Sequence, residues 1–182
     1  MANLTFNGTR ILMPGEGILN YNYTPLTFGD WFLPSKDEIN QMFINLKLES
    51  VGGFADDVYW SSSEFSANVA LIHSFTGAGG SFQAGKGNVS RVRACRTFTS
   101  GVAAYALRDT GPAGGLIFYV DGGTTYYEAA PYDQSSSVWS NIGIAEVGTG
   151  TAIGDGAQNT IDIITQPGHT TSAAKICADL VI

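Results

Sequence analysis

The sequence predicts an α+β domain made of short antiparallel strands and two or three helices. One short helix near the N-terminal third carries clear start signals. Many apolar runs of strand length follow, separated by turn residues, and the chain holds 23 glycines. Two further helical patterns lie near the C-terminus. Strands and helices that are grouped in this way, without repeats, are typical of an α+β domain, and 182 residues fit one domain.

The best-specified element is the helix expected from Lys36 to Leu46. Pro34 cannot continue a strand ladder, and Ser35 is a favourable N-cap residue. Glu38 stands three residues later, which completes a capping box. The apolar residues then recur at helical spacing, namely Ile39, Met42, Phe43 and Leu46. The pattern predicts an amphipathic helix that packs on a core.

Short strands and turns account for most of the rest. The first half is expected to hold strands in "VYWSSSEF", at 69–75 and at 89–98, with a glycine-rich hairpin or exposed loop at 76–88. Alternation along 89–98 predicts Arg91, Arg93 and Cys95 on one face and Arg96 on the other. The second half is expected to hold a buried strand at 115–123, another strand in "TYYEAAPYDQS", a helix at 157–166 and a last helix in "TSAAKICADLVI".

The charge balance argues against nucleic acid as a partner. The net charge is −7 and only nine residues are Lys or Arg, whereas phosphate binding needs clustered basic residues. Charged residues make up 14% of the chain, compared with about 25% in average soluble domains. No apolar run approaches the ~20 residues of a membrane span, so no membrane insertion is expected. The N-terminus lacks a signal-peptide pattern, which predicts synthesis in a cytosol.

The cysteines and aspartates do not form a metal-site pattern. Cys95 and Cys177 are far apart and outside any Cys/His cluster, so they are interpreted as buried thiols, with a disulfide left open. The aspartates lack the spacing of a calcium loop and are interpreted as solvated turn residues. Neither a metal nor a cofactor is expected.

The sequence shows no recognisable catalytic pattern. His73 and His169 are not accompanied by a nucleophile motif, and no Gly-x-Ser-x-Gly elbow is present. Trp31 and Trp60 are interpreted as core residues, while Trp139 is left open between core and sugar stacking. Arg93 is expected to pair with a carboxylate such as Glu64 or Asp30 inside the fold.

Three motifs, in order, carry a family resemblance. They are "DWFLPSKDEINQMF", "GGFADDVYWSSSEFSANVALIHSF" and "GKGNVSRVRACRTF". Together they resemble the domain found at the C-terminal ends of bacterial collagen-like adhesins, which is similar in fold to C-type lectins and to the formylglycine-generating enzyme group. The resemblance implies a C-type-lectin-like fold in which Trp31, Pro34, Ser35, Glu38, Trp60, Arg93 and Arg96 are structural.

The second half resembles the segment that precedes the Trp-x-Leu-Pro motif in that family. In this chain the order is reversed, which implies a circular permutation within residues 30–182, with halves 30–100 and 105–182; the alternative is a piece cut from a tandem array. The permutation predicts that Ile182 lies close to the segment before Asp30. Residues 1–29 are expected to serve attachment or oligomerisation. Some relatives pair a cysteine of the closing strand with one in the helix before the motif, but Cys95 is one residue off that position.

The resemblance also directs the functional expectation. The sugar motifs of true C-type lectins and the paired cysteines of the formylglycine enzymes are absent, so neither activity is implied. Binding in this fold group uses the strands and loops before the closing strand. The expected ligand-binding residues are Asn68, His73, Phe75, Ser81, Phe82, Gln83, Lys86 and Asn88. Small, polar and aromatic residues of this kind suit adaptable contacts.

The leading hypothesis is a non-enzymatic recognition module on a phage virion surface, such as a receptor-binding, fibre-tip or capsid decoration protein. Its expected partners are a host-surface glycan or protein, other virion proteins, and further copies of itself, with a homotrimer as the assumed oligomer. One alternative is a purely structural virion decoration protein without a ligand. A bland surface at 73–88 would favour this alternative, whereas a concave pocket there would favour recognition. The other is an enzyme, which a histidine beside a carboxylate in a deep cleft would favour.

Overall fold

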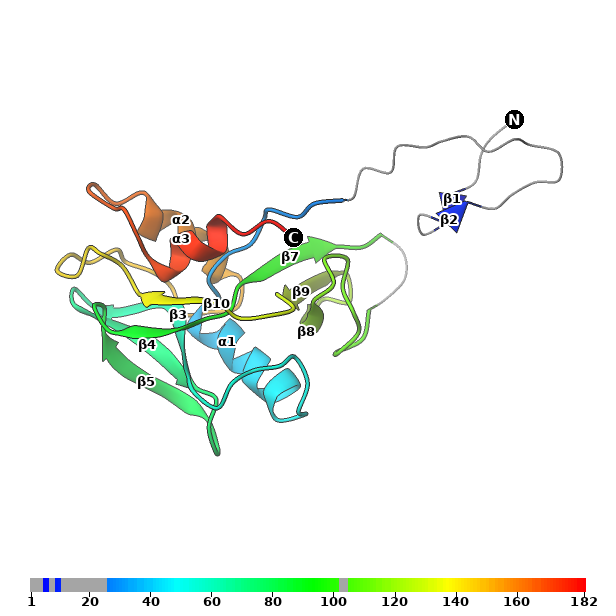
Figure 1. The fold of residues 1–182 in the computed structure, drawn as a ribbon, viewed down its shortest axis with the longest axis horizontal. Helices are drawn as coiled ribbons and strands as arrows, with labels where there is room; N and C mark the ends of the chain where they lie inside the picture. Colours follow the sequence, from blue (N-terminus) through cyan, green and yellow to red (C-terminus); the bar gives the residue numbers. More distant parts are fainter. Residues whose placement is uncertain (1–4, 7–8, 11–25, 102–104) are drawn as a thin grey trace.

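The computed structural model is an α+β fold (Figure 1). One helix lies between two sheets of mostly antiparallel strands, and two further helices pack on the outside. The structure describes residues 5–6, 9–10, 26–101 and 105–182. Most of the 1–29 segment, and with it the expected attachment or oligomerisation role, therefore lies outside the described residues. Within that segment, β1 (Thr5–Phe6) and β2 (Thr9–Arg10) form a short antiparallel pair.

The larger sheet has five strands in the order β10-β6-β3-β4-β5. Its members are β3 (Val58–Ser66), β4 (Val69–Ser74), β5 (Gly80–Gly85), β6 (Val89–Val92) and β10 (Gln134–Val138). β3, β4 and β5 follow one another as an antiparallel meander, so the glycine-rich 76–88 stretch forms a turn, an edge strand and a second turn. β6 then lies parallel to β3 on its other side.

The smaller sheet has three strands in the order β7-β9-β8. They are β7 (Cys95–Thr99), β8 (Leu116–Asp121) and β9 (Thr125–Ala129). Each sheet contains strands from both halves of the chain, since β10 pairs with β6 and β9 pairs with β7. The 30–100 and 105–182 halves are thus interleaved.

The single strand expected at 89–98 is wrong. The chain leaves the larger sheet after Val92 and enters the smaller one at Cys95, so Arg93 and Ala94 form the crossing between them. Both sides of the crossing are covered, and Arg93 to Arg96 are all buried. The expected alternation of faces does not hold there, because this backbone changes sheets.

The predicted capping box is present at the start of α1 (Lys36–Met42). The Ser35 hydroxyl accepts the Glu38 N–H at 3.2 Å, and the Glu38 carboxylate accepts the Ser35 N–H at 2.7 Å. The helix then widens into a π-helical segment, η1 (Phe43–Lys47), instead of continuing as regular α-helix to Leu46. Leu48 N–H bonds the Phe43 carbonyl, five residues back.

The core consists of two apolar clusters on either side of the larger sheet. In one, Ile39 and Met42 of α1 meet Tyr59 of β3 and Phe118 of β8, so α1 lies between the two sheets. The other contains Trp31, Trp60 and Trp139 together with residues of α2 (Asp155–Ile164) and α3 (Ala173–Ala178). All three tryptophans are core residues, which settles the position of Trp139.

The end of the chain lies beside the segment before Asp30, as the sequence predicts. The N–H of Phe28 donates to the carbonyl of Ile182 at 2.7 Å, and the N–H of Ile182 donates back at 3.1 Å. Figure 1 shows the C-terminus next to the chain that leads toward α1. This is the geometry that a circular permutation requires.

Candidate functional site

The structure separates the eight expected ligand-binding residues into a buried and an exposed group. His73 and Phe75 are each 1% exposed, and so is Lys86. The exposed residues are Asn68, Ser81, Phe82, Gln83 and Asn88. The expectation that all eight face a ligand therefore needs correction, because three of the side chains are enclosed by the fold.

His73 and Phe75 belong to the aromatic core beneath α1. The ring of Phe43 lies 5.2 Å from that of His73 and 5.5 Å from that of Phe75. The Gly80 N–H points at Nε2 of His73, and Nδ1 lies 3.2 Å from the Ser81 hydroxyl. Burial lowers the pKa of His73 to about 4, which keeps the ring neutral.

Lys86 forms a buried ion pair with Glu64. The ammonium also donates to the Ala145 carbonyl at 2.9 Å and lies 4.7 Å from the centre of the Trp139 ring. Arg93, expected to pair with Glu64 or Asp30, instead binds Asp133 at 2.7 Å. Glu64 is occupied by Lys86, and the Asp30 carboxylate is bound by another arginine.

That arginine is Arg96, whose guanidinium bridges Asp30 and the buried carboxylate of Glu128. Burial raises the pKa of Glu128, and bonds from Arg96 and from the Gly115 N–H oppose the rise. Burial likewise raises the pKa of Glu38, whose carboxylate accepts backbone N–H groups at the starts of both α1 and α2. These carboxylates hold elements together.

Three connections meet at one end of the larger sheet, and we call them the three-loop surface. They are the end of β3 with the β3–β4 turn (65–68), the β5–β6 turn with the first residue of β6 (86–89) and the segment 141–150. The Lys86 N–H bonds the Asn68 carbonyl at 3.0 Å, which joins the two turns. Figure 1 shows the three connections gathered at the left-hand end of the molecule.

The Glu64–Lys86 pair fixes the third connection to the other two. One Glu64 oxygen accepts the N–H groups of Val147 and Gly148 at 2.8 and 3.0 Å. The Glu64 N–H donates to the Thr149 hydroxyl at 2.7 Å. All three connections are therefore joined through one buried ion pair.

Apolar and amide side chains project from this arrangement. Phe65 is 59% exposed, Val89 67% and Ile144 89%, and the amides of Asn68 and Asn88 face solvent beside them along the chain. Sequence reasoning missed the three apolar residues. Their only signal is an isolated apolar side chain inside a polar, glycine-containing turn, which is also common on ordinary surfaces.

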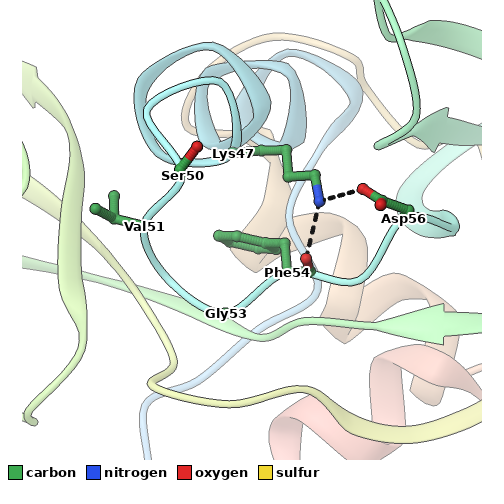
Figure 2. Close-up of a pocket in the computed structure, with 6 residues that line it drawn as sticks. All are labelled: Lys47, Ser50, Val51, Gly53, Phe54 and Asp56. Carbon is green, nitrogen blue, oxygen red and sulfur yellow. Dashed lines mark hydrogen bonds and ion pairs between the residues drawn. The ribbon is translucent and has the colours of Figure 1, made fainter.

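A pocket lies away from these loops, where η1 leads into the β3 strand. It has a volume of about 360 Å³ and is lined by Lys47, Ser50, Val51, Gly53, Phe54 and Asp56. Figure 2 shows the Lys47 ammonium donating to the Phe54 carbonyl at 2.9 Å and to the Asp56 carboxylate at 2.6 Å. The only cation of the lining is thus already paired, and none of the lining belongs to the 73–88 segment.

Among the hydrogen bonds of the described residues, neither His73 nor His169 is bonded to a carboxylate. His169 Nε2 lies 2.9 Å from the Ser172 hydroxyl, which in turn accepts the Lys175 N–H as the N-cap of α3. Cys95 and Cys177 are free, buried thiols. Burial raises the pKa of both. The disulfide that the sequence left open between them is not formed in this structure.

Within the described ranges, no group of three or more His, Cys, Asp or Glu side chains is arranged to hold a metal ion. No helix among the same residues is long and apolar enough to cross a membrane. Comparisons with models of protein families, with curated proteins and with solved structures found no match.

Proposed function

We propose that this chain is a non-enzymatic recognition module with a permuted C-type-lectin-like fold, displayed on a virion, and that its three-loop surface contacts a host-surface glycan or protein. The proposal rests on one observation above all. A buried ion pair, with its remaining bonds satisfied, holds three loops together, while large apolar and amide side chains on those loops remain in solvent. Preorganised loops lose little conformational entropy on binding.

The chemistry of the surface suits a glycan or a polar protein face. Asparagine amides can donate to and accept from hydroxyl groups, and Phe65 offers a ring for the apolar face of a sugar. No side chain of Phe65, Asn68, Asn88, Val89 or Ile144 carries a charge. The exposed Glu146 in the segment 141–150 adds one carboxylate, so the surface combines shape and hydrogen bonding with a single negative charge.

The pocket's position supports the second candidate, a structural decoration protein. The described pocket is not lined by residues of 73–88, and three of the expected contacts in that segment are buried. A decoration protein would need no ligand on the three-loop surface. The two candidates differ in whether this surface binds anything outside the virion.

The test is binding of the labelled chain to a panel of immobilised glycans and intact bacterial cells. A triple variant, Asn68→Ala with Asn88→Ala and Ile144→Ser, removes projecting groups without touching Glu64 or Lys86. We expect it to lose binding by at least about tenfold, because each lost contact is worth about 1 kcal/mol. The matched control is Ile161→Ser, which changes an exposed apolar residue of α2 and should bind like wild type.

Binding that is equal for the triple variant and the wild type would assign recognition to another surface. Wild-type binding to no glycan and no cell would favour the structural candidate. Circular dichroism of each variant separates loss of contact from loss of fold.

A further inference from the structure

The four lateral edges of the two sheets differ in how they are covered. β7 bonds through its backbone to Phe32, and β8 is bridged by Thr110. β10 carries a register shift, and the chain just beyond it is bridged to Ser172. β5 pairs with β4 on one side, and no backbone bond of the described residues is made to its other side between Ser81 and Ala84.

β5 also lacks the features by which proteins usually protect an edge. Its sequence, "GSFQAG", contains no charge and no proline. Its register with β4 runs without a shift from Gly80 to Gly85. Charges, prolines and bulges are the common means of preventing strand-to-strand association. Figure 1 shows β5 as the outermost strand of its sheet.

The ladder pattern defines which backbone groups face outward. The Lys86 N–H bonds the Asn68 carbonyl, so the bonded pairs of this ladder continue at every second residue, Ala84 and Phe82 included. The N–H and C=O groups of Ser81 and Gln83 consequently point away from β4. The side chains of Ser81, Phe82 and Gln83 are all exposed, and that of Phe82 is 54% exposed.

The strand is complementary to itself about Phe82. If two copies pair antiparallel through their outward groups, Ser81 of each bonds Gln83 of the other. Phe82 then faces Phe82 at a non-hydrogen-bonded site, where side chains approach most closely. On the Phe82 face the neighbours are Gly80 and Ala84, which leave room for two rings. An uncharged strand meets no like-charge repulsion in its own copy.

We propose that β5 is a homodimer interface, in which two copies join their larger sheets into one continuous sheet across a two-fold axis at Phe82. The arrangement is isologous and therefore closes as a dimer. The three-loop surface does not include Ser81, Phe82 or Gln83, so the central contacts of this dimer use none of its residues. The interface is independent of the proposed ligand.

Site-directed disulfide formation tests the geometry. Phe82→Cys places two thiols opposite each other at the two-fold axis, where mild oxidation should give a covalent dimer. Gln83→Cys is the matched control, since its thiols would lie opposite Ser81 of the partner and about 8 Å from each other, beyond disulfide reach. Cys95 and Cys177 are buried and should not contribute.

The mass in solution tests the interface in the unmodified chain. We expect wild type to show twice the monomer mass of 19.2 kDa by light scattering at high concentration. Gln83→Pro removes an outward N–H twice per dimer and leaves the β4 ladder intact, so it should raise the Kd by about tenfold or more. Gln83→Thr keeps the N–H and should remain dimeric.

Three results would overturn the proposal. One is a monomeric wild type at every concentration. Another is an oligomer whose Kd is unchanged in folded Gln83→Pro. The third is equal cross-linking of the two cysteine variants.

Discussion

Lys86 shows what a single residue decides in this molecule. It lies between two glycines in a stretch expected to be an exposed turn, and the family resemblance placed it among the ligand contacts. In the structure its side chain is buried on Glu64, Ala145 and Trp139. No sequence pattern signals this, because the partners lie far apart along the chain and only the closed sheet brings them together.

We predict that Lys86→Met destabilises the protein by about 3–5 kcal/mol, since it leaves the Glu64 carboxylate buried without a counter-ion. The double variant Lys86→Met with Glu64→Gln should cost clearly less, because the glutamine oxygen can still accept from Val147 and Gly148. Urea unfolding of the two variants and wild type measures both free energies. Equal costs for the single and double variants would show that the pair does not hold the loops.

His73 should make stability depend on pH below neutrality. Its folded pKa of about 4 lies below its ordinary value of 6.5, so the unfolded chain binds more protons between these values. The folded state should lose stability as pH falls from 6.5 toward 4, by about 3 kcal/mol at most. His73→Gln should flatten this part of the profile.

The measurement is the difference between the unfolding free energies of wild type and His73→Gln at each pH. Burial raises the pKa values of Glu38 and Glu128, so these groups act in the opposite sense. Their contribution to the stability of the folded state falls as pH rises above their ordinary pKa values. Because they are present in both proteins, they cancel in the difference. A difference that does not vary with pH would mean that His73 is accessible to protons in the folded state.

At the level of elements, the sequence predicted local structure well and connections poorly. The capping box of α1 depends on Ser35 and Glu38, which are three residues apart, and it forms as predicted. The single strand expected at 89–98 was wrong because Arg93 and Ala94 cross between sheets. Alternation of apolar and polar residues indicates which face of a strand is buried. Where the chain crosses between two sheets both faces are buried, so the alternation no longer reports the direction of the side chains.

The β4–β5 turn depends on Gly79. Its φ is +73°, and a Cβ there would fall 2.3 Å from the Phe43 ring. We predict that Gly79→Ala costs about 2–4 kcal/mol from backbone strain together with overpacking. Gly77→Ala, at φ +55° with open space around it, should cost only about 1 kcal/mol from strain.

Thermal or urea unfolding of the two alanine variants gives this comparison directly. The difference between them reports the contact with Phe43 alone. Equal costs would show that the turn moves freely away from η1.

At the scale of the whole molecule, the pairing of Phe28 with Ile182 brings the two ends of the described 26–182 range together. Two backbone hydrogen bonds connect these residues, as in the residue pair next to the turn of a β-hairpin. Sequence reasoning predicted this proximity only through a family resemblance, because no local pattern links residues at the two ends of a fold. Of the eight residues expected to contact a ligand, five are exposed, while His73, Phe75 and Lys86 are buried by contacts that no local pattern signals.

We predict that a re-permuted chain folds. It begins at Tyr105, runs to Ile182, continues through a two-residue Asn-Gly turn into Phe28 and ends at Ser100. Asn-Gly favours the type I′ turn that closes such a pair. Circular dichroism and urea unfolding should show the same secondary structure and one cooperative transition. Its failure to fold, while the linear 26–182 chain folds, would contradict the hairpin geometry.

An NMR titration of the labelled chain locates the binding surface directly; the titrant is the strongest binder from the glycan and cell panel, added as an isolated glycan or protein. We expect amide shift changes concentrated at 65–68, 86–89 and 141–150, with little change around Lys47 and Asp56. Shift changes confined to the pocket at 47–56, with the three loops unaffected, would contradict it.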